Sequence, residues 1–260
     1  MSDDILYEVA GDIGTITFNR PQARNAFTFA MYERVAEICD TVPTDGSVRV
    51  LIMTGAGDRA FAAGTDISQF RAFRTPEDAL QYEARIDDVI TRIERCAVPT
   101  IAAVAGACTG GGASIASACD LRVATRSAKF GFPVARTLGN CLSVRNYARL
   151  VALFGPTAVK ELVFTARLLG AEDGRALGFY SEVVEDHVAL MARTRELAQL
   201  IASHAPLTLR ATKEAIRRIT SSAAEDLEGD DLVVMCYTSA DFREGMEAFL
   251  AKRPPNWQGC

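Results

Sequence analysis

The sequence is poor in the residues that build several common kinds of functional site. It has two histidines and one tryptophan in 260 residues, and its seven cysteines form no C-x-x-C pair. Because zinc and iron sites need several such ligands close together, we expect no metal. The odd, scattered cysteines indicate reduced thiols, several of them acting as small core hydrophobes. Neither a G-x-x-x-x-G-K-[ST] nor a G-x-G-x-x-G pattern occurs, which argues against the common nucleotide-binding loops.

Basic charge and long apolar runs are also lacking. The chain carries 33 acidic and 28 basic residues, a formal net charge of −5. This acidic balance argues against general adhesion to nucleic acid or membranes, although a local basic patch for phosphates is compatible with it. No apolar stretch reaches the ~18 residues of a membrane span, and the start "MSDDILYEVA" has no apolar signal region. We therefore expect a cytoplasmic protein without nucleic-acid or membrane partners.

What the sequence does have is an α/β pattern of apolar segments. Residues 5–19 alternate around glycine-bearing turns and predict a hairpin, while residues 48–57 and 98–106 are apolar runs typical of strands buried on both faces. A helix is predicted from Pro76 to about Arg95. Two short strands are expected within 121–132. Further helices are predicted at 143–154, 157–165, 171–178, 188–203, 206–219, 224–237 and 240–252.

Two glycine-bearing segments follow the apolar strands and precede helices. They are "AFAAGTDI" (60–67) and "GACTGGGAS" (106–114). The first N–H groups of a helix have no intrahelical partner, so two of them pointing at one spot would form an oxyanion hole. Spacing alone fits plain tight turns equally well, and such turns are commoner.

Five segments together resemble the crotonase superfamily, the enoyl-CoA hydratase/isomerase family. The resemblance covers nearly the whole chain in the family's order. It implies a spiral of ββα turns over residues 1–200 that binds acyl-CoA, and a helical oligomerisation region over 201–260. It also implies a homotrimer or a hexamer of two trimers, with coenzyme A arriving as part of the substrate and no separate cofactor. The segments are "RPQARNAF", "AFAAGTDI", "VAGACTGGGASIASACDLRVAT", "AKFGFP" and "EGMEAFLAKRPPNW".

The same resemblance assigns site residues. The backbone N–H groups of Thr65 and Gly111 would hold the thioester oxygen of an acyl-CoA as it becomes an enolate. Asp66 is expected to act mainly as a helix cap, and Lys213 to be exposed. Arg24 and Lys252 are expected to contact the CoA phosphates, and a solvated surface position is the alternative for each. The residues expected around the CoA moiety are Arg24, Ala26, Ala63, Asp66, Ile67 and Lys252.

The match breaks at two catalytic positions. Hydratases of the family use two glutamates, and Ser114 and Val134 stand at those positions here. General acid–base assistance contributes roughly 10²–10⁴-fold per group, so ordinary hydration should suffer severely.

Several side chains are candidates for replacing those acids. Ser114 is a poor base, and a packing role is the alternative for it. Arg136 would clamp a second substrate carboxylate or form a structural ion pair, and Asn140 would orient a water or carboxylate or satisfy a turn. Cys141 is expected to be an inert thiol. For the acids of the next helix, Glu83, Asp87 and Asp88, we expect a solvated face, and the alternative is that one of them reaches into the pocket.

Three readings stay open. The first is hydratase or isomerase chemistry with an acid from elsewhere in the chain. The second is decarboxylation of a malonyl-type CoA thioester, in which loss of CO₂ creates the enolate without a base. The third is acyl-CoA binding without turnover.

Overall fold

The structure of the protein is a computed structural model, which describes residues 4–221 and 229–258. Its strands form two sheets. The large one has the order β1-β2-β3-β5-β7-β10 and the small one β4-β6-β8-β9. The predicted N-terminal hairpin is confirmed as β1 (Ile5–Ala10) and β2 (Ile13–Phe18), which pair antiparallel. From β2 to β10 the large sheet is parallel.

Three successive turns of chain build the middle of the molecule, and each adds one strand to each sheet and then a helix. This repetition is the ββα spiral that the family resemblance implies, and it confirms the predicted fold class. The turns are β3 (Val50–Gly55), β4 (Ala60–Ala63), α2 (Pro76–Glu94); β5 (Thr100–Val104), β6 (Ala107–Thr109), α3 (Gly111–Ala118); and β7 (Leu121–Thr125), β8 (Lys129–Gly131), α4 (Val134–Thr137).

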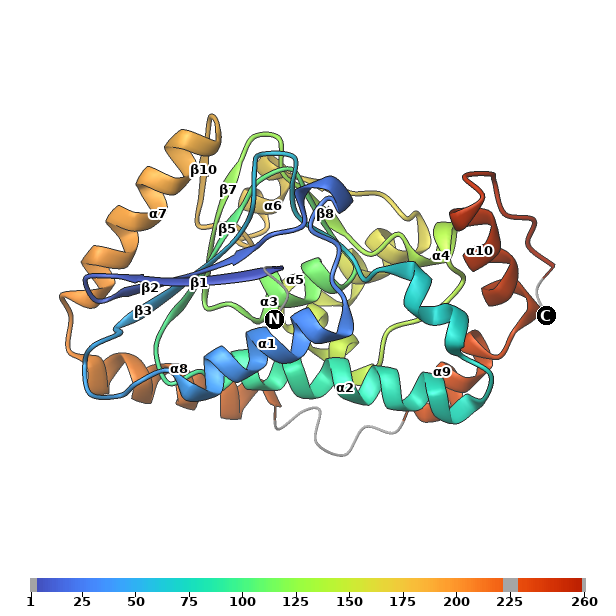
Figure 1. The fold of residues 1–260 in the computed structure, drawn as a ribbon, viewed down its shortest axis with the longest axis horizontal. Coiled ribbons are helices and arrows are strands. Elements are labelled where there is room, and N and C mark those ends of the chain that lie inside the picture. The colour runs from blue at the N-terminus through green and yellow to red at the C-terminus, as the bar shows by residue number, and fades with distance from the viewer. Residues whose placement is uncertain (1–3, 222–228, 259–260) are drawn as a thin grey trace.

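Helices cover both faces of the large sheet (Figure 1). On one face, β3, β5 and β7 pack against α7 (His187–Ala202). The opposite face packs against α1 (Phe29–Thr41) and α2 in the main core. Every residue of β3 is buried, as its continuous apolar run predicts.

The last third of the chain is mainly helical, as predicted, and α9 and α10 lie together at one end of the molecule (Figure 1). The helices predicted at 143–154 and 157–165 form one element, α5, kinked at Gly155, whose φ is +75°. Of the helix predicted from residue 224, the first residues lie outside the described ranges, as does Cys260. The remaining elements are α5 (Val144–Phe164), β9 (Leu169–Gly170), α6 (Ala171–Ala176), β10 (Glu182–Val184), α8 (Pro206–Ser221), α9 (Asp230–Tyr237) and α10 (Ala240–Leu250).

Local signals explain where α2 begins. Thr75 caps it and exchanges hydrogen bonds with Asp78 in a capping box, and Pro76 occupies the first turn. By contrast, the sequence did not reveal β4 and β6, which are short and rich in alanine, a residue that strands disfavour. Their pairing in the small sheet, rather than local propensity, makes them strands.

The prediction for Lys213 was wrong. Its side chain in α8 is only 10% exposed, and its Nζ lies 2.7 Å from Oδ2 of Asp120. The same ammonium donates to the carbonyl oxygen of Val98. The residue therefore joins α8 to the large sheet, a contact between remote segments that the helical pattern of "LRATKEAI" does not encode.

Candidate active site

The parallel register of the small sheet brings three loops to one edge. Ala63 of β4 lies opposite Thr109 of β6, which lies opposite Gly131 of β8. Because the three strands run parallel, the segments that follow them emerge side by side. These segments carry Thr65, Gly111 and Val134.

The two glycine loops are in direct contact. Gly64 and Gly110 have φ values of +92° and +52°, and a Cβ built on Gly110 would lie 3.3 Å from the Cα of Gly64. Both positions favour glycine because side chains disfavour positive φ. One residue further along, Oγ1 of Thr65 lies 3.2 Å from where a Cβ of Gly111 would be. The loops therefore converge as the sequence suggested.

The N–H groups of Thr65 and Gly111 donate to no other residue in ranges 4–221 and 229–258. Gly111 is the first residue of α3, so its N–H has no intrahelical acceptor. Thr65 lies in a parallel bridge with Phe27 that uses the Gly64 carbonyl and the Asp66 N–H and leaves the Thr65 N–H out. Unpaired backbone donors are the groups from which oxyanion holes are built.

The run of glycines also has a packing reason that the sequence did not show. A Cβ on Gly111 would overlap the hydroxyl of Tyr32, and one on Gly112 would overlap the carbonyl oxygen of Ala62. The space beside both glycines is thus taken by protein atoms. A substitution at Gly111 would disturb packing as well as any bound ligand.

A chain of three hydroxyls runs beside the glycine loops. Oγ1 of Thr65 lies 2.9 Å from Oη of Tyr32 and 2.9 Å from Oη of Tyr82. Burial, the main cause, raises the pKa of both phenols. Sequence reasoning missed both tyrosines because they come from α1 and α2, far from the glycine motifs.

The expectation that the acids of α2 face solvent was wrong for two of them. Glu83 and Asp87 are 5% and 8% exposed, whereas Asp88, with a side chain 66% exposed, does face solvent. The reason is tertiary: α9 and the segment before α5 pack over α2. Helix periodicity alone cannot reveal that a second layer covers a polar face.

Glu83 is held by hydrogen bonds from two remote segments. Its Oε1 accepts from the hydroxyl of Tyr237 at 2.6 Å, and its Oε2 accepts from the backbone N–H of Ser143 at 2.9 Å. The amide of Asn140 donates to the same Tyr237 hydroxyl at 2.9 Å. Burial raises the pKa of Glu83 to about 7, although both hydrogen bonds to its carboxylate act in the opposite direction.

Asp87, one turn further along α2, has a different environment. Its Oδ1 lies 3.0 Å from the guanidinium of Arg149 and also accepts from Ser143 and Asn146. Burial raises its pKa, and Arg149 opposes that rise. Asp87 is therefore a charge-paired structural group, and among the described residues Glu83 has no Lys or Arg partner.

Ser114 and Val134, the two positions where the family resemblance led us to expect glutamates, are both buried. Ser114 in α3 is 4% exposed, and its hydroxyl lies 3.5 Å from the carbonyl oxygen of Gly110. Val134, the first residue of α4, is 8% exposed. Ser114 contributes a hydroxyl and Val134 an apolar side chain, and neither position carries a carboxylate.

The other pocket candidates divide. Arg136 is exposed and makes no ion pair with any described residue, so the structural ion pair is not formed there. Asn140 is half-buried with its Oδ1 enclosed and unpartnered among the described residues. The Cys141 thiol donates to the Leu232 carbonyl. Its pKa is raised mainly by a hydrogen bond with Cys236 and secondly by burial.

Most residues expected around CoA gather beside β4. The backbone N–H of Ala63 donates to the carbonyl of Arg24, whose side chain is exposed. Asp66 pairs with Arg20 at 3.1 Å and caps the 3₁₀ helix Ile67–Ala72, as predicted for a helix cap. Ala26 and Ile67 are half-buried in the same region, whereas Lys252 is exposed just beyond α10.

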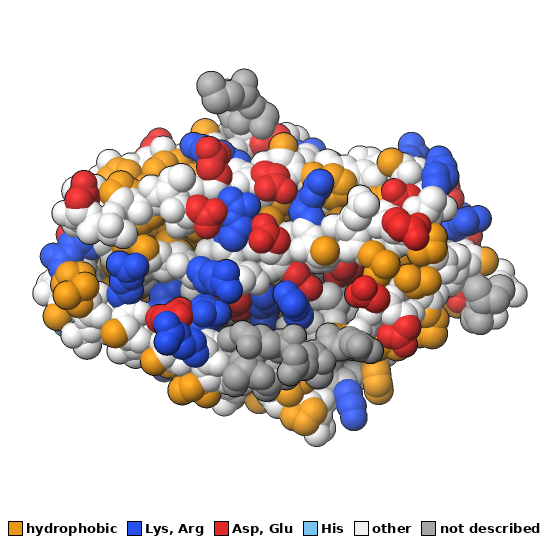
Figure 2. Space-filling view, turned by 90° about the horizontal axis from the view of Figure 1, so that it is seen from below, with side chains coloured by type: hydrophobic (Ala, Val, Ile, Leu, Met, Phe, Trp, Pro, Cys, Tyr) orange, Lys and Arg blue, Asp and Glu red, His pale blue; other side chains and the backbone are white. Residues whose placement is uncertain are grey.

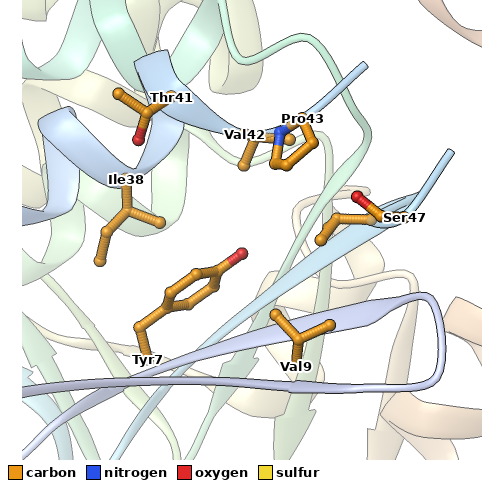
Figure 3. A pocket seen from close by; sticks show the side chains of 8 residues that line it. Tyr7, Val9, Ile38, Thr41, Val42, Pro43 and Ser47 are labelled. Atoms are coloured by element: carbon orange, nitrogen blue, oxygen red, sulfur yellow. The ribbon is translucent and has the colours of Figure 1, made fainter. Parts of the chain in front are cut away.

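Two other pockets lie away from these loops. One is lined by Tyr7 and Val9 of β1 and by the end of α1 and the segment after it (Figure 3). The second lies between the start of β3 and the α7–α8 junction. Figure 2 shows acidic and basic side chains interspersed on the face seen from below, where α1, α2 and α8 lie in Figure 1.

The described residues contain neither a membrane-spanning helix nor a cluster of metal ligands. No helix there is long and apolar enough to cross a membrane. In the same ranges, no group of three or more His, Cys, Asp or Glu is placed to hold a metal ion.

Comparison with known proteins gives consistent matches over the full length. Residues 8–260 match the family model described as enoyl-CoA hydratase/isomerase. The short-chain-enoyl-CoA hydratase of Clostridium acetobutylicum is 33% identical over 256 residues, covering 96% of each chain. The 1,2-epoxyphenylacetyl-CoA isomerase of Escherichia coli is 32% identical, covering all of both chains. A solved structure of methylmalonyl-CoA decarboxylase in complex with 2-nitronate-propionyl-CoA has a TM-score of 0.89 and 26% identity, again covering all of both chains.

Proposed function

The chain belongs to the enoyl-CoA hydratase/isomerase family, and on that premise we propose that it acts on an acyl-CoA thioester by stabilising an enolate. The thioester oxygen would accept hydrogen bonds from the N–H groups of Thr65 and Gly111. The observation that carries this proposal is the contact between the two glycine loops, in which both N–H groups are unused. Preorganised donors of this kind are worth roughly 10²–10³-fold in rate each.

The proposal extends to how CoA is held. Arg24 is exposed beside β4 and free to meet a phosphate, and Ala26, Ala63, Asp66 and Ile67 line the approach from that side. We place Lys252 at the nucleotide end, contributed by a neighbouring subunit of a trimer or hexamer. Coenzyme A enters as part of the substrate and no other cofactor is needed.

Hydration or double-bond isomerisation is the first reaction class. It agrees with the activities that name the two sequence relatives, and it requires an acid or base other than residues 114 and 134. Ser114 supplies only a hydroxyl, so another side chain near the thioester must transfer the proton.

Decarboxylation of a malonyl-type CoA thioester is the second class, favoured by two observations. The solved decarboxylase superposes closely on this chain, and Val134 makes the wall beside the hole apolar. The bond between the α-carbon and the carboxylate breaks, CO₂ leaves, and the electron pair becomes the enolate. A proton then adds to the α-carbon. Arg136 or Asn140 would orient the departing carboxylate.

The test is a mass-spectrometric assay in D₂O with crotonyl-CoA, a 3-enoyl-CoA and methylmalonyl-CoA. Water addition or a moved double bond identifies the first class, and CO₂ loss with uptake of one deuterium identifies the second. Binding without a product would indicate an acyl-CoA binder.

The oxyanion assignment has its own control, in which the ligand rather than the protein is altered. A Gly111 substitution is unsuitable because its Cβ would overlap Tyr32. A thioester and its thioether analogue differ only in the carbonyl oxygen. The thioester should bind more tightly than the thioether, and equal affinities would contradict the oxyanion hole.

A further inference from the structure

We propose that Glu83, acting through the hydroxyl of Tyr237, is the proton relay that replaces the two missing glutamates. This inference rests on the proposed function, because it requires an enolate to form beside Thr65 and Gly111. In this role Tyr237 is the group that meets substrate, and Glu83 is a positioning residue that takes up and returns the proton.

The relay is assembled from three segments far apart in the chain. Tyr237 at the end of α9 donates to Glu83 of α2, and Asn140 from the segment after α4 donates to Tyr237. The phenol ring of Tyr237 packs 6.2 Å from that of Tyr82, whose hydroxyl contacts Thr65. The relay and the donor pair thus border one cluster of aromatic side chains.

That cluster is apolar and largely buried, and the proposal places the acyl group against it. Its rings come from Phe70, Phe73, Tyr82, Tyr237 and Phe242, with centroids 4.8–6.4 Å apart in the contacts that involve Tyr237. The Oδ1 of Asn140, beside this cluster, is enclosed and has no hydrogen-bond partner among the described residues. A buried acceptor without a partner is costly unless a ligand or water reaches it.

Glu83 can change its charge because no cation holds it ionised. In the described part of the chain its nearest polar partners are a phenol and a backbone N–H, whereas Asp87 has Arg149. The ionisable groups that interact with Glu83 come from every element around it: Tyr32 of α1, Tyr82 and Asp87 of α2, Cys141, Tyr147 of α5, and Tyr237 of α9.

The hydrogen bonds define two states. When Glu83 is ionised, the Tyr237 hydrogen points at Oε1 and its oxygen accepts from Asn140. When Glu83 is protonated, its own hydrogen can point at the Tyr237 oxygen, which frees the phenol hydrogen to face the aromatic cluster. The ionised state accepts a proton from substrate, and the protonated state delivers one.

The proton balance is complete in both directions. In abstraction, the α-carbon hydrogen passes to the Tyr237 oxygen while the phenol proton passes to Oε1 of Glu83. The C–H electron pair becomes the enolate, whose oxygen lies at the two backbone donors. In delivery, the Glu83 proton returns to the phenol oxygen and the phenol proton adds to the α-carbon.

The test is exchange of the α-hydrogens of propionyl-CoA in D₂O, followed by mass spectrometry from pH 5.5 to 9. Abstraction needs ionised Glu83, so the wild-type rate should rise about tenfold per pH unit and level off above about pH 7. Glu83→Gln keeps the shape of the side chain but cannot take up the proton. We expect its rate to fall roughly 10²–10⁴-fold and its pH step to vanish.

Two further variants separate chemistry from structure. Tyr237→Phe keeps the ring and should lose the exchange to the same extent while Glu83 remains. Asp88→Asn removes an exposed carboxylate from the same helix and should keep both the rate and the pH step. A Glu83→Gln protein that is slower yet retains the wild-type pH step would make Glu83 merely structural and overturn the relay.

The remaining outcomes distinguish the relay from the proposed function. If wild type turns over any thioester of the panel but exchanges no propionyl-CoA hydrogen, or exchanges it without a step near pH 7, the relay is wrong and the proposed function stands. If the thioester binds no better than its thioether, the oxyanion hole fails, whatever Glu83 does.

Discussion

The two parts of the candidate site are built by different means. The glycine loops present backbone N–H groups, and these are positioned by the register of β4 and β6. The second part consists of the side chains of Glu83, Asn140 and Tyr237, which meet only because α9 covers α2. The first part is written in two contiguous motifs, and the second is scattered over more than 150 residues. Backbone groups carried by contiguous motifs can therefore be inferred locally, whereas the meeting of these three side chains depends on packing.

The largest effect is expected when a side chain is added to a closely packed glycine of the glycine loops. Gly112→Ala would place a Cβ against the Ala62 carbonyl, and neither backbone can yield easily. We expect a loss of about 3 kcal/mol or more in the free energy of unfolding, measured by urea denaturation. Gly46→Ala is the matched control: its φ is +92° but its surroundings are open, so only the ~1–2 kcal/mol of backbone strain should appear. Equal losses in the two variants would contradict close packing at Gly112.

A pH-dependent stability difference tests the side-chain half. Burial raises the pKa of Glu83 from 4.5 to about 7, so the folded protein binds this proton more tightly than the unfolded chain does. The stabilisation is fully present below pH 4.5 and is lost as the pH rises through 7. Glu83→Gln has no such loss, so its stability relative to wild type should improve by about 2–3 kcal/mol between pH 4.5 and 8.

Denaturation of both proteins across this pH range measures the difference, in which the titration of unchanged groups cancels. Asp88→Asn should show no comparable change relative to wild type, because Asp88 is exposed. A flat difference for Glu83→Gln would mean that Glu83 is ionised as readily in the folded protein as in the unfolded chain.

Thr65 belongs to one glycine loop, and its hydroxyl contacts Tyr82, which packs against Tyr237. A substitution of Thr65 therefore tests the link between the two parts of the site. Thr65→Val keeps the shape of the side chain but leaves the hydroxyls of Tyr32 and Tyr82 without this partner. We expect a loss of about 2 kcal/mol in the free energy of unfolding, because buried polar groups that lose a partner are costly. Thr65→Ser, which restores the hydroxyl, should recover most of the loss in the same measurement. A Thr65→Val protein as stable as Thr65→Ser would show that the three-hydroxyl chain contributes little.

The smallest effect is expected where CoA would meet the outer edge of the glycine loops. Arg24→Ala removes an exposed cation, so its affinity for acyl-CoA should fall by about 1 kcal/mol, roughly fivefold, and the difference should shrink at high salt. Calorimetry with acyl-CoA and the matching acyl-pantetheine, which lacks the nucleotide phosphates, measures it. Arg34→Ala removes an exposed arginine paired with Glu37 on α1 and should bind normally. An Arg24→Ala protein that loses affinity for both ligands equally would exclude a phosphate contact.

Much of the fold could be read from the sequence, and the misses share one cause. The hairpin, β3, β5 and α2 followed from apolar periodicity and capping signals. The strands β4 and β6 were missed, and Lys213 was wrongly expected to be exposed. In each case a contact with a remote segment overrides the local pattern. The same is true of the acids of α2, whose polarity predicted a solvated face.

The sequence alone was enough to identify the family, the spiral order of strands and helices, and the two glycine loops that come into contact in the fold. It could do so because motif order, apolar periodicity and the conformational needs of glycine are local properties. Only the tertiary structure decided that Tyr32 occupies the space beside Gly111, and that Glu83 is buried against Tyr237 while Asp88 faces water. Burial is set by what packs over a helix from elsewhere in the chain, and that covering layer shifts the pKa of a carboxylate toward neutrality.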